Sequence, residues 1–399
     1  MKNPLRWLSP GRDRARPVEH RTEQKMASGL SSLFAMAPVD GATWSGTDYG
    51  SLARVGFMQN PVVHRCVRLI AQTASAIPLL VYENARELDE HPLLALISHP
   101  NPQQSGAAFL ESLIGHLLIS GNAYVERLSV DDTPRELVLL RPDRMRVLTD
   151  RNGWVDGYEY AARGGNRVQR MASDGTCPVL HIGLFHPLDD HYGFPPLRSA
   201  LMALDVHNAA SRWNKALLDN SARPSGALVY AAGDHSNLSD DQFDRLKKEL
   251  EDGYTGSSRA GRPLLLEGGL DWKAMGFSPR DMDFAAGRDA AARDIALAFG
   301  VPPMLLGIPG DNTYSNYQEA NRALVRQTVL PMINRIIDSI NHWMQPAFGT
   351  DIRLAIDEDC IEGLAAERET VWSRLSAAEF LSDDEKRQAV GYSPRSDDQ

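Results

Sequence analysis

Hydrophobic positions around residue 300 form two helical patterns with a short break between them. Before the break, apolar residues recur at helical spacing up to Phe299. Gly300 can adopt the positive φ that ends a helix, and Pro302 and Pro303 prevent the helix from continuing. After a loop rich in glycine and proline, apolar residues again recur at helical spacing over roughly two dozen residues. The pattern predicts a helix, a rigid turn, a loop and a long amphipathic helix kinked at Pro331.

The pattern before residue 197 predicts a mixed domain of helices and strands. Apolar residues at helical spacing alternate with short strand-like runs, and Gly-rich and Pro-rich turns separate them. We expect helices at 61–74, 91–98 and 106–119. We expect strands at 77–82, 123–128, 137–140, 145–148, 157–161, 167–171 and 179–182.

Further along the chain, two helices enclose a small α/β insert. The first helix begins at Leu197 and is broken by Arg223-Pro224, and the second begins at Ser278-Pro279. The insert is expected to hold strands at 226–230, 264–266 and 270–275 and a helix at 238–254. Two more helices are expected after residue 357, the second with a capping box between Ser382 and Glu385.

The N-terminal segment and the overall composition add two constraints. Residues 1–48 place arginines among Pro, Gly and Ser, which is typical of a flexible arm that is either solvated or in contact with neighbouring subunits or DNA. The 399 residues carry a net charge of −10, so tight nonspecific binding of nucleic acid is not expected. No apolar run is long enough to cross a membrane, and no signal peptide is recognisable. The three cysteines lie far apart and indicate reduced thiols in a cytosolic chain.

One loop could carry metal chemistry. His186, Asp189, Asp190 and His191 offer two imidazoles and two carboxylates, but their spacing matches no known zinc pattern. We interpret the segment as a polar loop and keep a metal-dependent hydrolase as an alternative. The glycine pairs lack the residues of a phosphate-binding loop or a dinucleotide-binding turn. We therefore predict no catalytic residue, cofactor or metal, and no enzymatic activity.

Several motifs together resemble the portal proteins of tailed bacteriophages of the HK97 type. The stretch Phe277-Ser-Pro-Arg-Asp-Met-Asp-Phe284, the segment Phe299-Gly-Val-Pro-Pro-Met-Leu-Leu-Gly307, Tyr314-Ser-Asn316 and Leu330-Pro331 carry the resemblance. Its order and spacing extend from about Asn60 to about Pro394. The compact length further resembles portals of the gene transfer agents of alphaproteobacteria.

The resemblance implies an α+β portal fold with a defined order of parts. These are a flexible arm at 1–48, a wing at 49–196, a first stem helix at 197–221 and a clip at 222–277. A second stem helix at 278–300, a turn and tunnel loop at 301–315, a long kinked wing helix and strand at 316–356 and a helical crown and tail at 357–399 follow. The alternative within this class is a non-ring scaffold or adaptor of the virion.

The same resemblance implies a ring of twelve copies at one capsid vertex. Double-stranded DNA is expected to pass through the ring and to bind it only weakly. The expected partners are the major capsid protein, the large terminase subunit and the head–tail adaptor, first in the bacterial cytoplasm and then in the particle. Charges along the second stem helix could pair within the helix, pair between subunits or face DNA. The expected tunnel residues are Asp281, Asp283, Arg288, Asp289, Gly307, Asp311, Asn312, Thr313, Tyr314 and Asn316. The expected clip interface comprises Tyr254, Arg259, Arg262 and Trp272.

Overall fold

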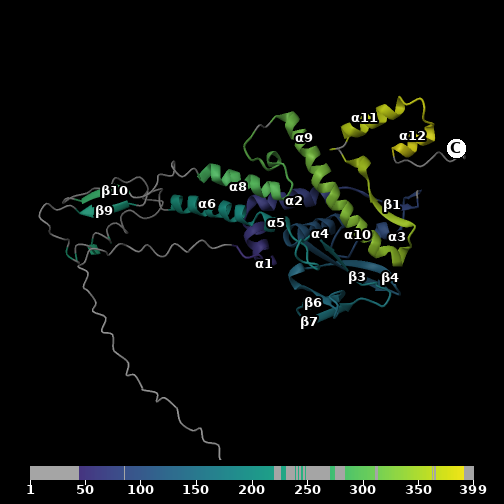
Figure 1. Ribbon diagram of the computed structural model, residues 1–399, viewed down its shortest axis with the longest axis horizontal. Helices are drawn as coiled ribbons and strands as arrows, with labels where there is room; N and C mark the ends of the chain where they lie inside the picture. The colour runs from purple at the N-terminus through teal and green to yellow at the C-terminus, as the bar shows by residue number, and fades with distance from the viewer. Residues whose placement is uncertain are drawn as a thin grey trace, which may run out of the picture. The chain divides into compact units, whose positions relative to one another are not determined.

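The computed structural model describes residues 45–84, 86–219, 226–230, 270–274, 284–310, 313–361 and 365–390, with a few single positions between 239 and 248 and Gly363. The arm expected at 1–48 lies outside these residues up to position 44. The expected insert helix at 238–254 and strand at 264–266 are outside them as well, apart from those single positions. Figure 1 labels helices and strands of the described residues.

Helices α2 and α4 form the centre of the core. The Asn60 side chain accepts hydrogen bonds from two backbone N–H groups at the start of α2, and Gly121, at φ 76°, ends α4. The two helices pack against each other and bury a continuous set of aliphatic side chains. The helices of this part are α1 (Tyr49–Ser51), the π-helix η1 (Leu52–Met58), α2 (Pro61–Ser75), α3 (Pro92–Ser98) and α4 (Gly106–Ser120).

Two three-stranded antiparallel sheets follow α4, and a buried carboxylate joins them. The strand orders are β4-β3-β8 and β5-β6-β7. Glu126 on β3 is buried and accepts hydrogen bonds from Arg167 (2.8 Å) and Gln169 (3.0 Å) on β7. The strands are β3 (Asn122–Val130), β4 (Thr133–Leu140), β5 (Met145–Thr149), β6 (Val155–Ala162), β7 (Gly165–Arg170) and β8 (Val179–Gly183), with a 3₁₀ turn at Pro142–Arg144.

A third sheet brings distant parts of the chain together. Strand β1 (Leu79–Glu83) lies between β2 (Arg86–Leu88) and β11 (Ile352–Ile356), and Val81 pairs with Leu354. Both partners of that pair are buried. The pairing joins the strand that follows residue 348 to a strand that directly follows the helix at 61–75.

The remaining helices pack on the same core. Helix α6 contacts α8, and α10 contacts strands β8 and β11. Helix α9, a π-helical segment and α10 follow one another without a break in helical backbone. These elements are α5 (Pro196–Ser199), α6 (Leu201–Asp219), α8 (Phe284–Ala298), the 3₁₀ helix η4 (Pro303–Leu306), α9 (Tyr314–Leu324), the π-helix η5 (Val325–Val329) and α10 (Leu330–Phe348).

The last described elements are short. They are β9 (Gly226–Tyr230) paired with β10 (Leu270–Ala274), the 3₁₀ helix η6 (Glu358–Cys360), α11 (Ala365–Ser376) and α12 (Asp383–Ala389). The capping box predicted at Ser382 and Glu385 is present. No helix in the described part of the chain is both long and apolar enough to cross a bilayer.

Candidate functional site

The segment from α8 to α9 has one buried side and one exposed side. Ile295, Phe299 and Val301 are buried in the core. On the opposite side, Arg293 is exposed and Leu297 is 78% exposed. The buried face of α8 holds the helix in the core. Its exposed face, with an apolar side chain and charged groups, is available to bind other molecules.

The turn after α8 is fastened to the π-helical segment. Gly300 has φ 66°, and its carbonyl oxygen accepts a hydrogen bond of 2.7 Å from the Thr328 hydroxyl. A Cβ atom at Gly300 would lie 2.7 Å from that hydroxyl oxygen, so the position favours glycine both for its backbone angle and for the close approach. The hydrogen bond connects the end of α8 with the long helix that contains η5.

The loop that follows is held at both ends. Gly307 closes the 3₁₀ turn with φ 72°, and the Arg293 guanidinium donates a hydrogen bond of 2.6 Å to the Pro309 carbonyl oxygen. At the other end, the Thr313 hydroxyl accepts a hydrogen bond from the Asn316 backbone N–H and so caps α9. Tyr314, the first residue of α9, is 79% exposed. Short polar groups and an aromatic ring thus face solvent at this turn.

A buried polar joint orients α6, and with it α8. The Asn60 amide group at the start of α2 lies 3.0 Å from Nδ1 of His207 and donates to the Asn208 side-chain oxygen at 2.9 Å, and both partners belong to α6. Burial lowers the pKa of His207, and the nearby Arg288 on α8 lowers it further. Arg288 itself lies 3.5 Å from the adjacent Asp289.

Some of the expected site residues lie within the described part of the chain and the others lie outside it. Of the described ones, Arg288 and Asp289 lie on α8, Gly307 ends the 3₁₀ turn, and Thr313, Tyr314 and Asn316 lie at the start of α9. Trp272 lies on β10 opposite Leu228 of β9. The remaining expected residues lie outside the described part of the chain: Asp281, Asp283, Asp311, Asn312, Tyr254, Arg259 and Arg262.

Two residues that fasten the segment were not predicted. Thr328 lies within a helical pattern and Arg293 on a charged helix face, and neither position has a recognisable motif. The kink predicted at Pro331 stays a prediction, but the structure places the π-helix Val325–Val329 directly before it. A π-helical turn shifts the register of backbone hydrogen bonds, which is compatible with a proline that lacks an N–H.

The loop considered as a metal site is instead braced by its own backbone. Asp189 accepts hydrogen bonds from the N–H groups of His191 and Tyr192, and these bonds lower the pKa of its carboxyl group. His186 Nδ1 accepts a hydrogen bond from the Leu188 N–H. Among the residues that the structure describes, no group of three or more His, Cys, Asp or Glu side chains is close enough to hold a metal ion.

The comparison with solved structures defines the class of protein. The chain superposes with a TM-score of 0.53 on the portal protein of an HK97-family phage from Corynebacterium diphtheriae, which is 17% identical, over 80% of this chain and 99% of the other. A chain in the neck of an empty gene transfer agent particle matches with a TM-score of 0.70 and 49% identity, over 88% of this chain and 96% of the other. The fold is therefore that of an HK97-type portal subunit.

The sequence comparison agrees. The profile of the family described as "Phage portal protein" matches residues 61–391. The portal protein of Enterobacteria phage HK97 is 27% identical over 73% of this chain and 68% of its own length. An uncharacterised protein of Rickettsia bellii is 43% identical over 85% of this chain and 89% of its own length. The chain belongs to the phage portal protein family. It is a structural component of a virion and not an enzyme.

Proposed function

We propose that twelve copies of this chain form the portal ring of a gene-transfer-agent particle. The observation that carries the proposal is the 49% sequence identity, over 88% of the chain, to a protein in the neck of such a particle. A protein that is 48% identical to this chain occurs in the neck of a native particle whose structure was computed with twelvefold symmetry. A head-to-tail contact that closes generates a ring of this kind. The ring is assembled in the bacterial cytoplasm and occupies one vertex of the capsid.

Within that ring, each part of the subunit has a role. Residues 49–196 with the long helix and strand at 316–356 form the wing, 197–221 and 278–300 the stem, 222–277 the clip and 357–399 the crown. The wing meets the major capsid protein, and the clip meets the large terminase subunit during filling and the head–tail adaptor afterwards. The packing of α6 against α8, on either side of the clip residues in sequence, supports the assignment of the stem.

The exposed side of α8 and the loop before α9 would line the channel for double-stranded DNA. Among the residues of the turn from Gly307 to Asn316 there is no Lys or Arg, so few counterions are released on contact and DNA can slide. Arg293 is drawn back to the Pro309 carbonyl oxygen. The arrangement favours transient contact with phosphates over a firm grip.

A loop deletion tests the channel assignment. Removing residues 307–312 should leave rings intact in electron micrographs, because the deletion removes the buried Ile308 and the Arg293–Pro309 hydrogen bond but keeps the buried side chains of α8 and α10 in place. DNA content per particle, measured by quantitative PCR after nuclease treatment, should fall. Intact rings with normal DNA filling would remove the loop from the channel. No observation on the His186–His191 loop favours the hydrolase alternative.

A further inference from the structure

The C-terminal helices bury almost nothing within one copy of the chain. None of the described residues between 363 and 390 is buried, although α11 and α12 are regular helices. Helices of 12 and 7 residues are marginal on their own in water, and most helical stability in proteins comes from packing of an apolar face. The segment therefore needs a surface to pack on.

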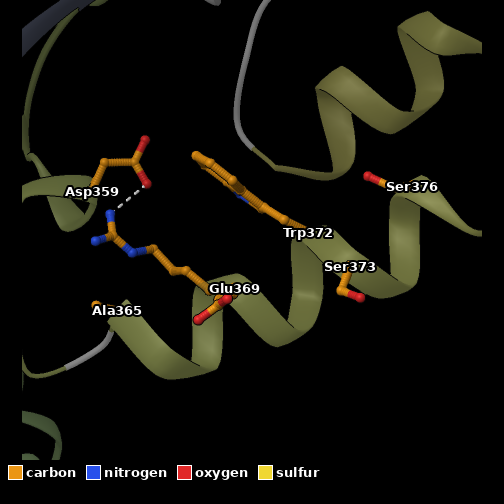
Figure 2. Close-up of a pocket in the computed structure, with 7 residues that line it drawn as sticks. Asp359, Ala365, Glu369, Trp372, Ser373 and Ser376 are labelled. Atoms are coloured by element: carbon orange, nitrogen blue, oxygen red, sulfur yellow. Dashed lines mark hydrogen bonds and ion pairs between the residues drawn. The ribbon is translucent and has the colours of Figure 1, made fainter.

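Helix α11 carries one half of such a contact. A pocket of about 480 Å³ lies between η6 and α11, and Figure 2 shows Trp372 extending from the helix across it. The Trp372 side chain is 47% exposed. Asp359 and Arg368, which both line the pocket, form an ion pair of 2.9 Å, and a dashed line at Asp359 in Figure 2 marks it. The remaining lining residues are Ala365, Glu369, Ser373 and Ser376.

The turn between α11 and α12 carries the other half. Phe380 is 85% exposed in the subunit, so a large aromatic side chain is left without cover, and it does not line the pocket beside Trp372. The described part of the chain thus presents both a projecting ring and a cavity, and the ring does not fill the cavity of its own copy. A head-to-tail assembly joins two different surfaces of this kind.

Charge is complementary in the same two places. Glu369 is exposed at the rim of the pocket, and Lys386 lies on α12 beyond Phe380. Neither side chain forms an ion pair with a described residue of its own copy. With Phe380 of one copy in the pocket of another, Glu369 and Lys386 carry opposite charges on the two sides of the contact, and an exposed ion pair of this kind is weak.

We propose that the pocket beside Trp372 receives Phe380 of an adjacent copy of this chain. The inference rests on the proposed ring and names one of the contacts that hold the C-terminal helices in it. An aromatic side chain seated in a desolvated pocket is the type of residue that dominates interface energies. The same contact gives the C-terminal helices a surface to pack on.

Mixed-isotope cross-linking tests the contact. Full-length protein with benzoylphenylalanine at position 380 is prepared in ¹⁴N and ¹⁵N forms, mixed, assembled into rings and irradiated. We expect cross-linked peptides that join position 380 of one isotope to residues 365–376 of the other. Cross-links to residues 365–376 or 391–399 of the same isotope alone, or to a different protein in whole particles, would overturn the proposal.

The ring itself is scored separately by electron microscopy. Rings without mixed cross-links reject this contact and leave the proposed function standing, whereas the absence of rings under all assembly conditions and in particles rejects both. Trp372→Ala should reduce the mixed cross-link by about tenfold or more, as expected for removal of an interface anchor. The matched control Leu188→Ala changes an exposed apolar side chain on a wing loop, and the cross-link should be unchanged.

Discussion

At the scale of single residues, one buried polar side chain joins the start of α2 to α6. Asn60 caps α2 through its side-chain oxygen and reaches His207 and Asn208 of α6 through its nitrogen. The helix start at position 61 was predicted from the sequence, and the structure adds the Asn60 cap before Pro61, which is a preferred combination at a helix start. Its second role was not readable, since it depends on a helix far away in the chain.

Asn60→Ala should therefore destabilise the protein more than a simple cap substitution does. Loss of the cap costs about 1 kcal/mol, and the unpaired buried groups on α6 add about 1–3 kcal/mol. Thermal unfolding at fixed protein concentration measures the effect. The control Asn152→Ala, in an exposed turn, should change stability by no more than about 0.5 kcal/mol. Equal effects of the two substitutions would contradict the joint.

A pair of glycines gives opposite predictions. A Cβ atom at Gly193 would lie 2.0 Å from the Gly121 carbonyl oxygen, so Gly193→Ala should destabilise by about 3 kcal/mol or more. Gly115 lies inside α4 with open space around it, so Gly115→Ala should stabilise by about 0.5–1 kcal/mol. Chemical denaturation of both variants tests the prediction, and a neutral Gly193→Ala would show that the loop at Gly193 is not held against Gly121.

Two partly buried histidines make stability depend on pH. Burial lowers the pKa of His116 and of His181 to about 4, from 6.5. The unfolded chain then binds more protons than the folded chain between these values, so stability should fall as the pH drops from about 6.5 to about 4. Melting temperatures across this range test it. The double variant His116→Gln/His181→Gln should show a flatter curve, and an unchanged slope would reject the assignment.

At the scale of elements, the type and position of most helices and strands could be predicted, and their partners could not. Helix α2 and strands β3 and β9 lie within two residues of the predicted bounds, because apolar spacing and turn residues define them locally. The pairing of β1 with β11 depends on contacts across most of the chain. The π-helices η1 and η5 were not predicted, because a local shift in the backbone hydrogen-bond register does not change the spacing of hydrophobic residues in a recognisable way.

The π-helix η5 should act as the fastening point of the turn after α8. Thr328→Val keeps the shape of the side chain but removes the hydrogen bond to the Gly300 carbonyl oxygen, at a cost of about 1 kcal/mol. Amide hydrogen exchange in residues 296–301 should accelerate about fivefold as a result. Ser339→Ala, which removes only a bond to its own helix, is the control. Equal exchange in both variants would contradict the fastening.

At the scale of the whole molecule, family membership accounts for an arrangement that has no evident purpose in one copy. The chain carries a net charge of −10, a helix with its outer face exposed and two C-terminal helices that bury no described residue. Each of these is explained if neighbouring copies cover the subunit and a polyanion passes along its inner side. What sequence reasoning could not supply is which side chains face the neighbour and which face the channel.

Electron cryomicroscopy of particles that contain this protein tests the central claim most directly. The account predicts density for twelve copies at a single vertex, with α8 and the loop before α9 turned toward the central axis. Particles in which the chain is monomeric, or distributed over many vertices, or in which α8 points away from the axis, would contradict it.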